Sequence, residues 1–232
     1  MNISKKSPRT TLKGCSEYKQ RSNTYAYRVD DSIYLNITNR CTNDCIFCLR
    51  NNGSTAYGSN PLWLEKEPST EEVILAVDEL FFNECKSFVF CGYGEPTCRL
   101  DTLVEIAKIL KSKYNLPIRL NTNGQSELIN RNTKNTEHLF GLVDKVSISL
   151  NSANAEEYDK LCKPVFGSCA YDAIIQFGKH CVGNIPEVIF SVVEDTLSYD
   201  DIEKCRKIVA EIGAKLRVRK FIDENDKNPE VK

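Results

Sequence analysis

Three cysteines that lie close together in the sequence carry the clearest chemical signal. Cys41, Cys45 and Cys48 have CxxxCxxC spacing within NRCTNDCIFCLRNNG, directly after the run IYLNIT. Structural zinc is usually closed by four protein ligands. A cubane iron–sulfur cluster normally has four cysteine ligands, so three thiolates leave one iron open to a cofactor or substrate. The spacing favours a [4Fe-4S] cluster; the alternatives are a zinc site completed by Cys91 or His138, or a cysteine-rich loop that binds no metal.

A second motif follows another apolar run. Residues 88–91, FVFC, lead into GYGEPT, which contains Gly94 and Glu95. Glycine lets the backbone approach a small ligand closely, and a carboxylate accepts charge-assisted hydrogen bonds from an ammonium group. Alone, this motif would indicate a turn. Together with the cysteines, it predicts the binding of a cofactor that carries an amine.

The elements that must position these motifs alternate along the chain. Capped amphipathic segments open at Ser69, which has Glu72 three residues on, at Asp101 and at Ser198. Such alternation predicts βαβ units and a parallel sheet with its site at the carboxyl ends of the strands, as a partial barrel or a doubly wound sheet. The predicted strands are residues 33–38, 88–91, 118–122, 146–150, 188–193 and 216–218.

Polar residues alternate with apolar ones along several of these strands. Parallel strands covered on both faces should be nearly all apolar. The polar set, represented by Asn36, Arg119, Ser149 and Arg217, should therefore point into a concave interior. This favours a partial, laterally open (β/α)6 TIM-type barrel. With Arg219, the arginines would suit the carboxylate of a cofactor and an anionic substrate, unless those of the last strand lie on an exposed edge.

Length and composition predict one domain. We expect residues 1–24 to be a basic tail, residues 25–222 the core domain and residues 223–232 a polar tail. The net charge of −1 does not indicate nucleic acid or a lipid surface as a partner. No segment has the roughly 20 apolar residues that a membrane span needs. We therefore expect a cytoplasmic protein, in which most of the eleven cysteines are not disulfide-bonded.

The two motifs resemble those of the radical SAM superfamily. That superfamily has CxxxCxφC after its first strand, with an aromatic residue at φ, here Phe47, and a Gly-Gly-Glu-Pro motif after its second, to which GYGEP is similar. The resemblance covers roughly residues 25–220. It is closest to small radical SAM proteins associated with TatD-family nucleases, in YLNITNRCTNDCIFCLR, VSISLNS and EEYDKLCKP. That association does not disclose a reaction.

The resemblance implies a function for several residues. Cys41, Cys45 and Cys48 would bind three irons of a [4Fe-4S] cluster, and S-adenosylmethionine (SAM) would chelate the fourth. An external reductant of flavodoxin or ferredoxin type would reduce the cluster. Cleavage of SAM would then give methionine and a 5′-deoxyadenosyl radical, which abstracts hydrogen from a substrate that the sequence does not identify.

The cofactor contacts implied by the resemblance are spread over the strand ends. Glu95 would bind the SAM amine, and Phe47 and Val193 would contact adenine. Ser149 and Asn151 would contact the ribose, with Asn121 and Asn123 as competing candidates. The roles of Cys91, Cys162 and Cys169 stay open. The alternative functions are a non-catalytic iron–sulfur or zinc binding module and a glycyl-radical activating enzyme.

Overall fold

The computed structural model describes residues 21–51, 55–56, 58–131 and 134–220. Residues 1–20 of the predicted N-terminal tail and the whole predicted C-terminal tail, 223–232, lie outside the described residues. None of the described helices is long and apolar enough to cross a membrane.

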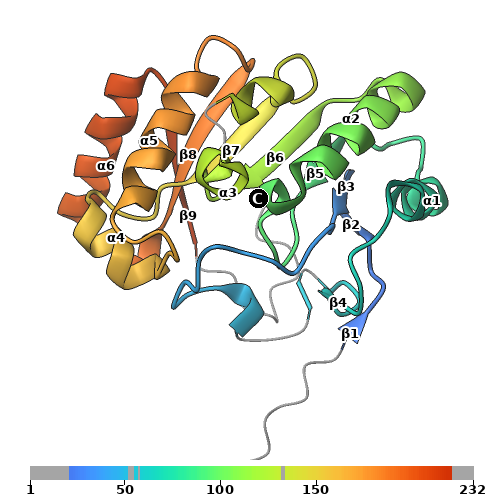
Figure 1. Cartoon of the computed structure of the whole chain (residues 1–232), viewed down its shortest axis with the longest axis horizontal. Helices are drawn as coiled ribbons and strands as arrows, with labels where there is room; N and C mark the ends of the chain where they lie inside the picture. The colour runs from blue at the N-terminus through green and yellow to red at the C-terminus, as the bar shows by residue number, and fades with distance from the viewer. Residues whose placement is uncertain (1–20, 52–54, 57, 132–133, 221–232) are drawn as a thin grey trace, which may run out of the picture.

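A seven-stranded sheet in the order β2-β3-β5-β6-β7-β8-β9 organises the molecule (Figure 1). The strands from β3 to β9 are parallel to their neighbours, whereas β2 pairs with β3 in antiparallel fashion. The two edges of the sheet do not pair with each other, which confirms a partial, laterally open barrel. The strands are β2 (Ala26–Val29), β3 (Ser32–Leu35), β5 (Ser87–Phe90), β6 (Ile118–Thr122), β7 (Lys145–Ser149), β8 (Glu187–Val193) and β9 (Lys215–Arg219).

Helices follow the strands and cover the outer face of the sheet (Figure 1). Ser69 and Ser198 cap α1 and α6 as predicted, and Gly213 ends α6 with φ of 85°. Asp101 is not a cap, because the turn before it runs directly into α2, which begins at Leu100. The helices are α1 (Thr70–Leu80), α2 (Leu100–Tyr114), α3 (Ser126–Asn130), α4 (Ala155–Cys162), α5 (Cys169–Cys181) and α6 (Tyr199–Ile212), and the 3₁₀ turns are Leu49–Asn51, Pro96–Arg99, Asn135–Leu139 and Glu194–Thr196.

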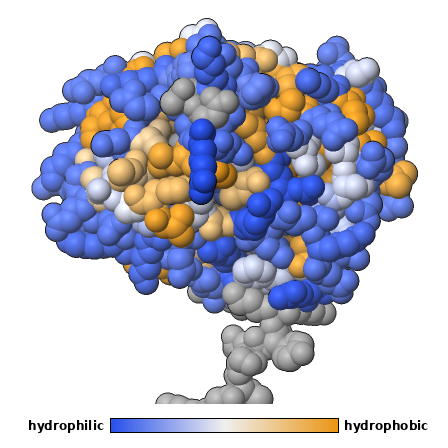
Figure 2. All heavy atoms as spheres, viewed as in Figure 1, coloured by the Kyte–Doolittle hydropathy of each residue, from blue (hydrophilic) through white to orange (hydrophobic). Residues whose placement is uncertain are grey.

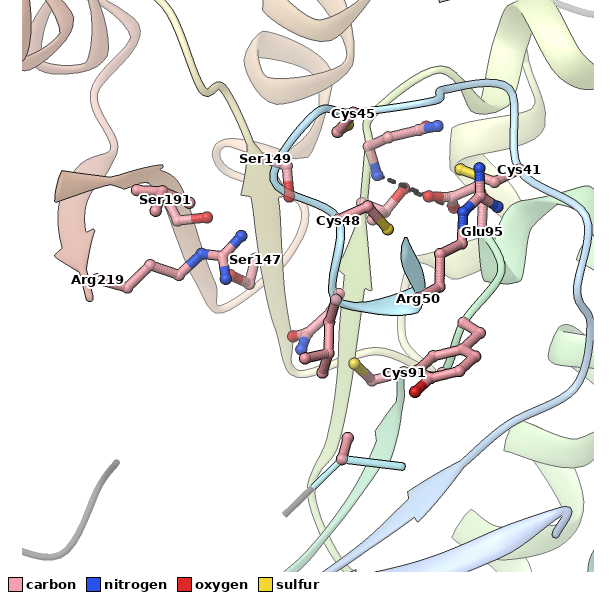
Figure 3. Close-up of a pocket in the computed structure, with 18 of the residues that line it drawn as sticks. Cys41, Cys45, Cys48, Arg50, Cys91, Glu95, Ser147, Ser149, Ser191 and Arg219 are labelled. Atoms are coloured by element: carbon pink, nitrogen blue, oxygen red, sulfur yellow. Dashed lines mark hydrogen bonds between the residues drawn. The ribbon is translucent and has the colours of Figure 1, made fainter. Parts of the chain in front are cut away.

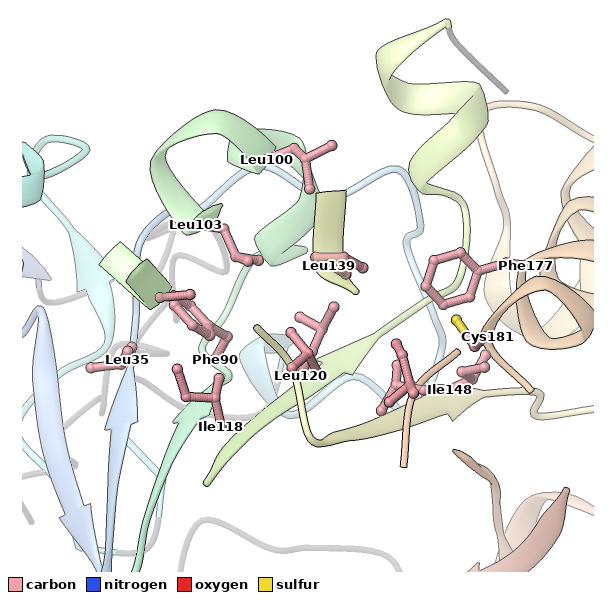
Figure 4. Packing of buried hydrophobic residues seen from close by; sticks show 14 of the residues in the cluster. Leu35, Phe90, Leu100, Leu103, Ile118, Leu120, Leu139, Ile148, Phe177 and Cys181 are labelled. Carbon is pink, nitrogen blue, oxygen red and sulfur yellow. The ribbon is translucent and has the colours of Figure 1, made fainter. Parts of the chain in front are cut away.

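The apolar set of the strands packs under the helices. Alternate residues of β6 and β7, such as Leu120 and Ile148, are fully buried, while their polar neighbours face the other side of the sheet. Figure 4 shows these side chains together with Leu103 of α2 and Phe177 of α5. Exposed large apolar side chains are scattered, in keeping with the mostly hydrophilic face seen in Figure 2.

Three short strands were not predicted. β2 forms the edge of the sheet next to β3. β1 (Arg21–Ser22) pairs with β4 (Trp63–Leu64) in a separate two-stranded sheet. The chain just before β4 also covers Asn36, whose Nδ2 donates to the carbonyl oxygens of Thr24 at 3.1 Å and Leu62 at 2.8 Å. Asn36 is therefore fully buried and does not line the cavity described below, contrary to the prediction.

Candidate functional site

One cavity of about 500 Å³ lies where the parallel strands end, and the cysteine loop forms part of its wall (Figure 3). This volume falls within the range of roughly 300–1,000 Å³ that is usual for small-molecule sites. Every residue predicted to bind the cluster or SAM lines this cavity: Cys41, Cys45, Phe47, Cys48, Gly94, Glu95, Asn121, Asn123, Ser149, Asn151 and Val193. Arg119, Arg217 and Arg219 line it as well.

Backbone hydrogen bonds fasten the cysteine loop to the C-terminal end of α4. The N–H groups on either side of Cys45 donate to the carbonyl groups of Cys162 and Leu161, each at 3.0 Å. The N–H of Val165 donates in turn to the carbonyl of Thr42 at 2.8 Å. The loop is thus held on a helix that follows it by more than a hundred residues in the sequence.

Hydrogen bonds among buried side chains hold the same loop in place. Asn43 donates through Nδ2 to the Tyr158 hydroxyl at 2.7 Å, and its Oδ1 accepts from Gln125 Nε2 at 2.9 Å. Gln125 also reaches the Tyr158 hydroxyl at 3.1 Å and accepts from the Thr42 hydroxyl at 2.8 Å. Asn43, Gln125 and Tyr158 are almost completely buried. Such satisfied buried networks rigidify the backbone that they hold.

The pKa values of the three thiols are all raised, and burial contributes to each shift. Burial raises the pKa of Cys41 to about 12 and raises the pKa of Cys48. A hydrogen bond with the buried Cys162 raises the pKa of Cys45, and burial adds to it. The Arg50 guanidinium, whose Nη2 donates to the Asn43 carbonyl at 2.7 Å, opposes these shifts at all three cysteines because it favours the thiolates.

The donor set fits an iron–sulfur cluster in its chemistry. Three thiols from one short loop border the same cavity, with a guanidinium beside them that stabilises negative charge. Within the described ranges, no three His, Cys, Asp or Glu side chains form a preassembled metal site, and Cys45 is engaged with Cys162. His138 is exposed in the Asn135–Leu139 turn and does not line the cavity, so it does not support the zinc alternative.

Glu95 joins the ends of β5 and β6. Its Oε1 accepts from the Thr97 N–H at 3.0 Å, the Thr97 hydroxyl at 2.7 Å and the Thr122 hydroxyl at 2.8 Å. Its Oε2 accepts from the Asn123 N–H at 2.6 Å. Burial raises the pKa of Glu95, and these hydrogen bonds act in the opposite direction because they favour the carboxylate. Oε2 accepts one hydrogen bond and keeps capacity for a second donor from the cavity.

Gly94 lets the backbone of the GYGE turn pack closely against another segment of the protein, and not against a ligand as the sequence suggested. A Cβ atom at this position would lie 2.2 Å from the carbonyl oxygen of Thr38. The next N–H, that of Glu95, donates to the Arg40 carbonyl at 2.7 Å. The glycine therefore lets the GYGE turn dock against the segment that leads into Cys41, which brings the two motifs together.

The predicted ribose candidates differ in what they already bind. The Asn123 amide donates to the Thr42 hydroxyl at 2.8 Å and accepts from the Gln125 N–H at 3.0 Å, so it mainly shapes the turn. Asn121 and Asn151 each have a buried Oδ1 without a hydrogen-bond partner. Buried polar atoms usually have a partner. These two amides are therefore better placed than Asn123 to bind a ligand.

Some residues of the cavity were not among the predicted cofactor contacts. Arg50 lies two positions after Cys48, which is the only signal that could have found it. Tyr34, on β3, and Cys91 line the cavity, and Asn121 hydrogen-bonds the Cys91 thiol. Cys162 is buried and hydrogen-bonded to Cys45. Cys169 is exposed at the start of α5 and does not line the cavity.

Solved structures of other proteins share the fold of this chain. A radical SAM methyltransferase from Sphaerobacter thermophilus superposes with a TM-score of 0.54 at 16% identity, covering 84% of this chain and 68% of that one. HydG, a maturase of the [FeFe]-hydrogenase, superposes with a TM-score of 0.56 at 15% identity, covering 86% of this chain and 45% of its own. At such identities the likeness shows the fold alone.

Comparison with curated protein sequences gives no significant match. Residues 35–209 match the Radical SAM superfamily, and this range takes in both the cysteine loop and the GYGEP turn. The superfamily uses a [4Fe-4S] cluster and SAM, which are the cofactors that the sequence predicted. Because the match extends over most of the chain, this protein belongs to the radical SAM superfamily.

Proposed function

We propose that the protein is a radical SAM enzyme in which Cys41, Cys45 and Cys48 ligate the cluster and Glu95 helps to bind SAM. When bound, the reduced cluster and SAM supply a 5′-deoxyadenosyl radical that abstracts a hydrogen atom from the substrate. The observation that supports this most strongly is that the thiol loop and the carboxylate line one cavity at the strand ends. Arg50 and the buried amides hold the loop in place.

The remaining cavity residues position the cofactor. Glu95 Oε2 would accept a hydrogen bond from the ammonium group of SAM, while Asn121, Ser149 and Asn151 would offer amides and a hydroxyl to the ribose. Phe47, from the cysteine loop, and Val193, from the end of β8, would provide apolar surface for adenine.

The setting of the reaction belongs to the same proposal. The enzyme would act in the cytoplasm, with an external one-electron donor of ferredoxin or flavodoxin type. The finer resemblance, to radical SAM proteins associated with TatD-family nucleases, remains a prediction and assigns no reaction. A glycyl-radical activating enzyme and a non-catalytic iron–sulfur module are the alternatives to be tested.

The decisive experiment is anaerobic reconstitution followed by SAM cleavage. The cluster-loaded protein, incubated with dithionite and SAM, is expected to form 5′-deoxyadenosine and methionine, detected by chromatography and mass spectrometry. Alanine replacement of Cys41, Cys45 and Cys48 together should remove most of the iron and the absorbance at roughly 400 nm, because three metal bonds are lost.

The matched control is Cys169→Ala, since this thiol is exposed and lies outside the cavity. It should retain iron, absorbance and 5′-deoxyadenosine formation. If the wild-type protein binds the cluster but forms no 5′-deoxyadenosine, it is a binding module. If the triple variant keeps four irons per chain, the cluster lies elsewhere.

A further inference from the structure

The cavity wall away from the cysteine loop is positively charged. Arg119 comes from β6, Arg217 and Arg219 come from β9, and Lys220 follows them. Among the described residues that line the cavity, Glu95 is the only carboxylate, and its oxygens accept four hydrogen bonds from the protein. Basic side chains therefore outnumber carboxylates among the described residues of this wall.

Hydroxyl groups lie in register with these arginines. Ser149 of β7, Ser191 of β8 and Arg217 of β9 are direct neighbours across the sheet, and all three line the cavity. Figure 3 shows Arg219 extending from β9 over the side of the cavity where Ser147 and Ser191 lie. Guanidinium and hydroxyl donors side by side on parallel strands form a strip suited to an oxyanion.

Arg119 and Arg219 approach a common point from different strands. The Cys91 thiol is within electrostatic reach of both: burial raises the pKa of Cys91, and the two guanidinium groups oppose that shift. Arg119 Nη2 donates to the Tyr34 hydroxyl at 2.6 Å, whereas its Nε is buried without a hydrogen-bond partner. A buried donor left in this state is destabilising, and a hydrogen-bond acceptor on a ligand would remove that cost.

SAM is a poor ligand for several guanidinium groups. It carries a sulfonium and an ammonium group, which a row of arginines repels, and a single carboxylate. Arg50 lies beside the cysteine loop, next to the proposed position of SAM, while Arg217 and Arg219 lie on the last strand of the sheet. The guanidinium and hydroxyl donors on β6 to β9, with the unpaired Nε of Arg119 among them, therefore suit a second, anionic molecule better than they suit SAM.

We infer that the substrate carries an oxyanion, either a carboxylate or a phosphate, which Arg119, Arg217 and Arg219 bind together with the hydroxyls of Ser149 and Ser191. This inference deepens the proposed function and rests on it. The anionic group would be held against β9, and the rest of the substrate would extend toward the cysteine loop and SAM. Arginine suits either oxyanion because its planar fork binds two oxygens at once.

The test uses the full-length, cluster-loaded protein saturated with SAM under anaerobic conditions. Isothermal titration calorimetry with inorganic pyrophosphate and, separately, with succinate distinguishes phosphate from carboxylate at constant ionic strength. We expect one of the two anions to bind with 1:1 stoichiometry. Arg119→Gln and Arg219→Gln should each weaken that binding about tenfold or more, because a charge-assisted hydrogen bond is lost.

Two further variants make the result specific. Arg219→Lys keeps the charge but not the planar fork, so its affinity should fall between those of the wild type and Arg219→Gln. Arg206→Gln, on the exposed face of α6 where it pairs with Glu203, should not change anion binding. Circular dichroism of each variant confirms that it is folded before titration.

The same samples separate this inference from the proposed function. The SAM dissociation constant of Arg219→Gln should equal that of the wild type; if it rises in step with the anion constant, the arginines hold SAM and the inference is wrong. It is also wrong if neither anion binds the wild type with a dissociation constant below about 10 mM, that is, with a binding free energy of more than about 2.7 kcal/mol. Failure to form 5′-deoxyadenosine would instead refute the proposed function.

Discussion

At the scale of single residues, the Glu95 carboxylate connects two strand ends while it faces the cavity. Oε1 holds the turn through Thr97 and Thr122, and Oε2 has the one bond from the Asn123 N–H. A neutral amide in this position would turn one oxygen acceptor into a donor. It would then meet an N–H or hydroxyl donor of the protein and lose the charge that attracts an ammonium group.

We therefore predict that Glu95→Gln weakens SAM binding about tenfold or more and leaves iron content nearly unchanged. The expected loss is on the order of 1.5–3 kcal/mol, the contribution of a hydrogen bond to a charged group. Equilibrium dialysis with labelled SAM and iron analysis of the reconstituted variant measure the two quantities.

Thr122→Val is the control for structural damage, because it removes one donor to Glu95 and keeps the carboxylate. It should bind SAM more tightly than Glu95→Gln does. Equal SAM dissociation constants for Glu95→Gln and the wild type would show that Glu95 only supports the turn.

At the scale of elements, the cysteine loop depends on α4 and on the buried amides below it. The Tyr158 hydroxyl accepts from Asn43 and Gln125, so Tyr158→Phe leaves the Asn43 amide without its acceptor. We predict a loss of roughly 1–3 kcal/mol in the free energy of unfolding, together with faster loss of iron to a chelator. Urea unfolding and chelator-driven iron release measure these effects.

Tyr171→Phe separates loop positioning from general stability. Tyr171 is also buried, but its hydroxyl donates only to the Ser152 carbonyl, at 3.2 Å. Its removal should lower stability and leave the rate of iron release unchanged. If the two variants release iron at the same rate, the amide network does not position the loop.

The elements also show which features the sequence could predict. The alternation of apolar and polar residues along β6 and β7 revealed both the strand positions and the face that lines the cavity. The apolar residues pack under the helices, and the polar residues face the cavity on the other side of the sheet. The β2 strand and the segment over Asn36 have no such pattern. Their positions depend on contacts with β3 and on two backbone carbonyl groups, which only the folded chain brings near.

The same limit applies to the site. The cysteines and Glu95 were predictable because their spacing is local and specific. Asn43, Gln125 and Tyr158 meet from three distant parts of the chain, with no motif between them, so nothing in their sequence neighbourhoods indicates a network.

At the scale of the whole molecule, cofactor binding should stabilise the fold, because the cavity draws residues from the first strands to the last. SAM at about 100 times its dissociation constant would contribute roughly 2.7 kcal/mol. For a chain of about this size, each kcal/mol shifts the unfolding midpoint by roughly 2–4 °C. We predict an increase of about 5–10 °C in the cluster-loaded protein, measured by anaerobic differential scanning calorimetry.

The triple alanine variant of the cysteine loop is the reference for this measurement. Without the cluster it should show a much smaller increase at the same SAM concentration. An equal increase in both proteins would mean that SAM stabilises the chain from a position that does not involve the cysteines.

The open edge at β9 has a consequence for how the protein behaves in a concentrated solution. On its outer side β9 pairs with no strand of the part of the chain that the structure describes, so its N–H and C=O groups are a template for another chain. Lys215, Arg217 and Arg219 place a cation at every second position of that edge. Two copies pairing edge to edge would bring like charges together, which discourages aggregation. The arginines proposed to bind the substrate would thus also keep molecules apart, and neutralising them should make the protein more prone to self-association.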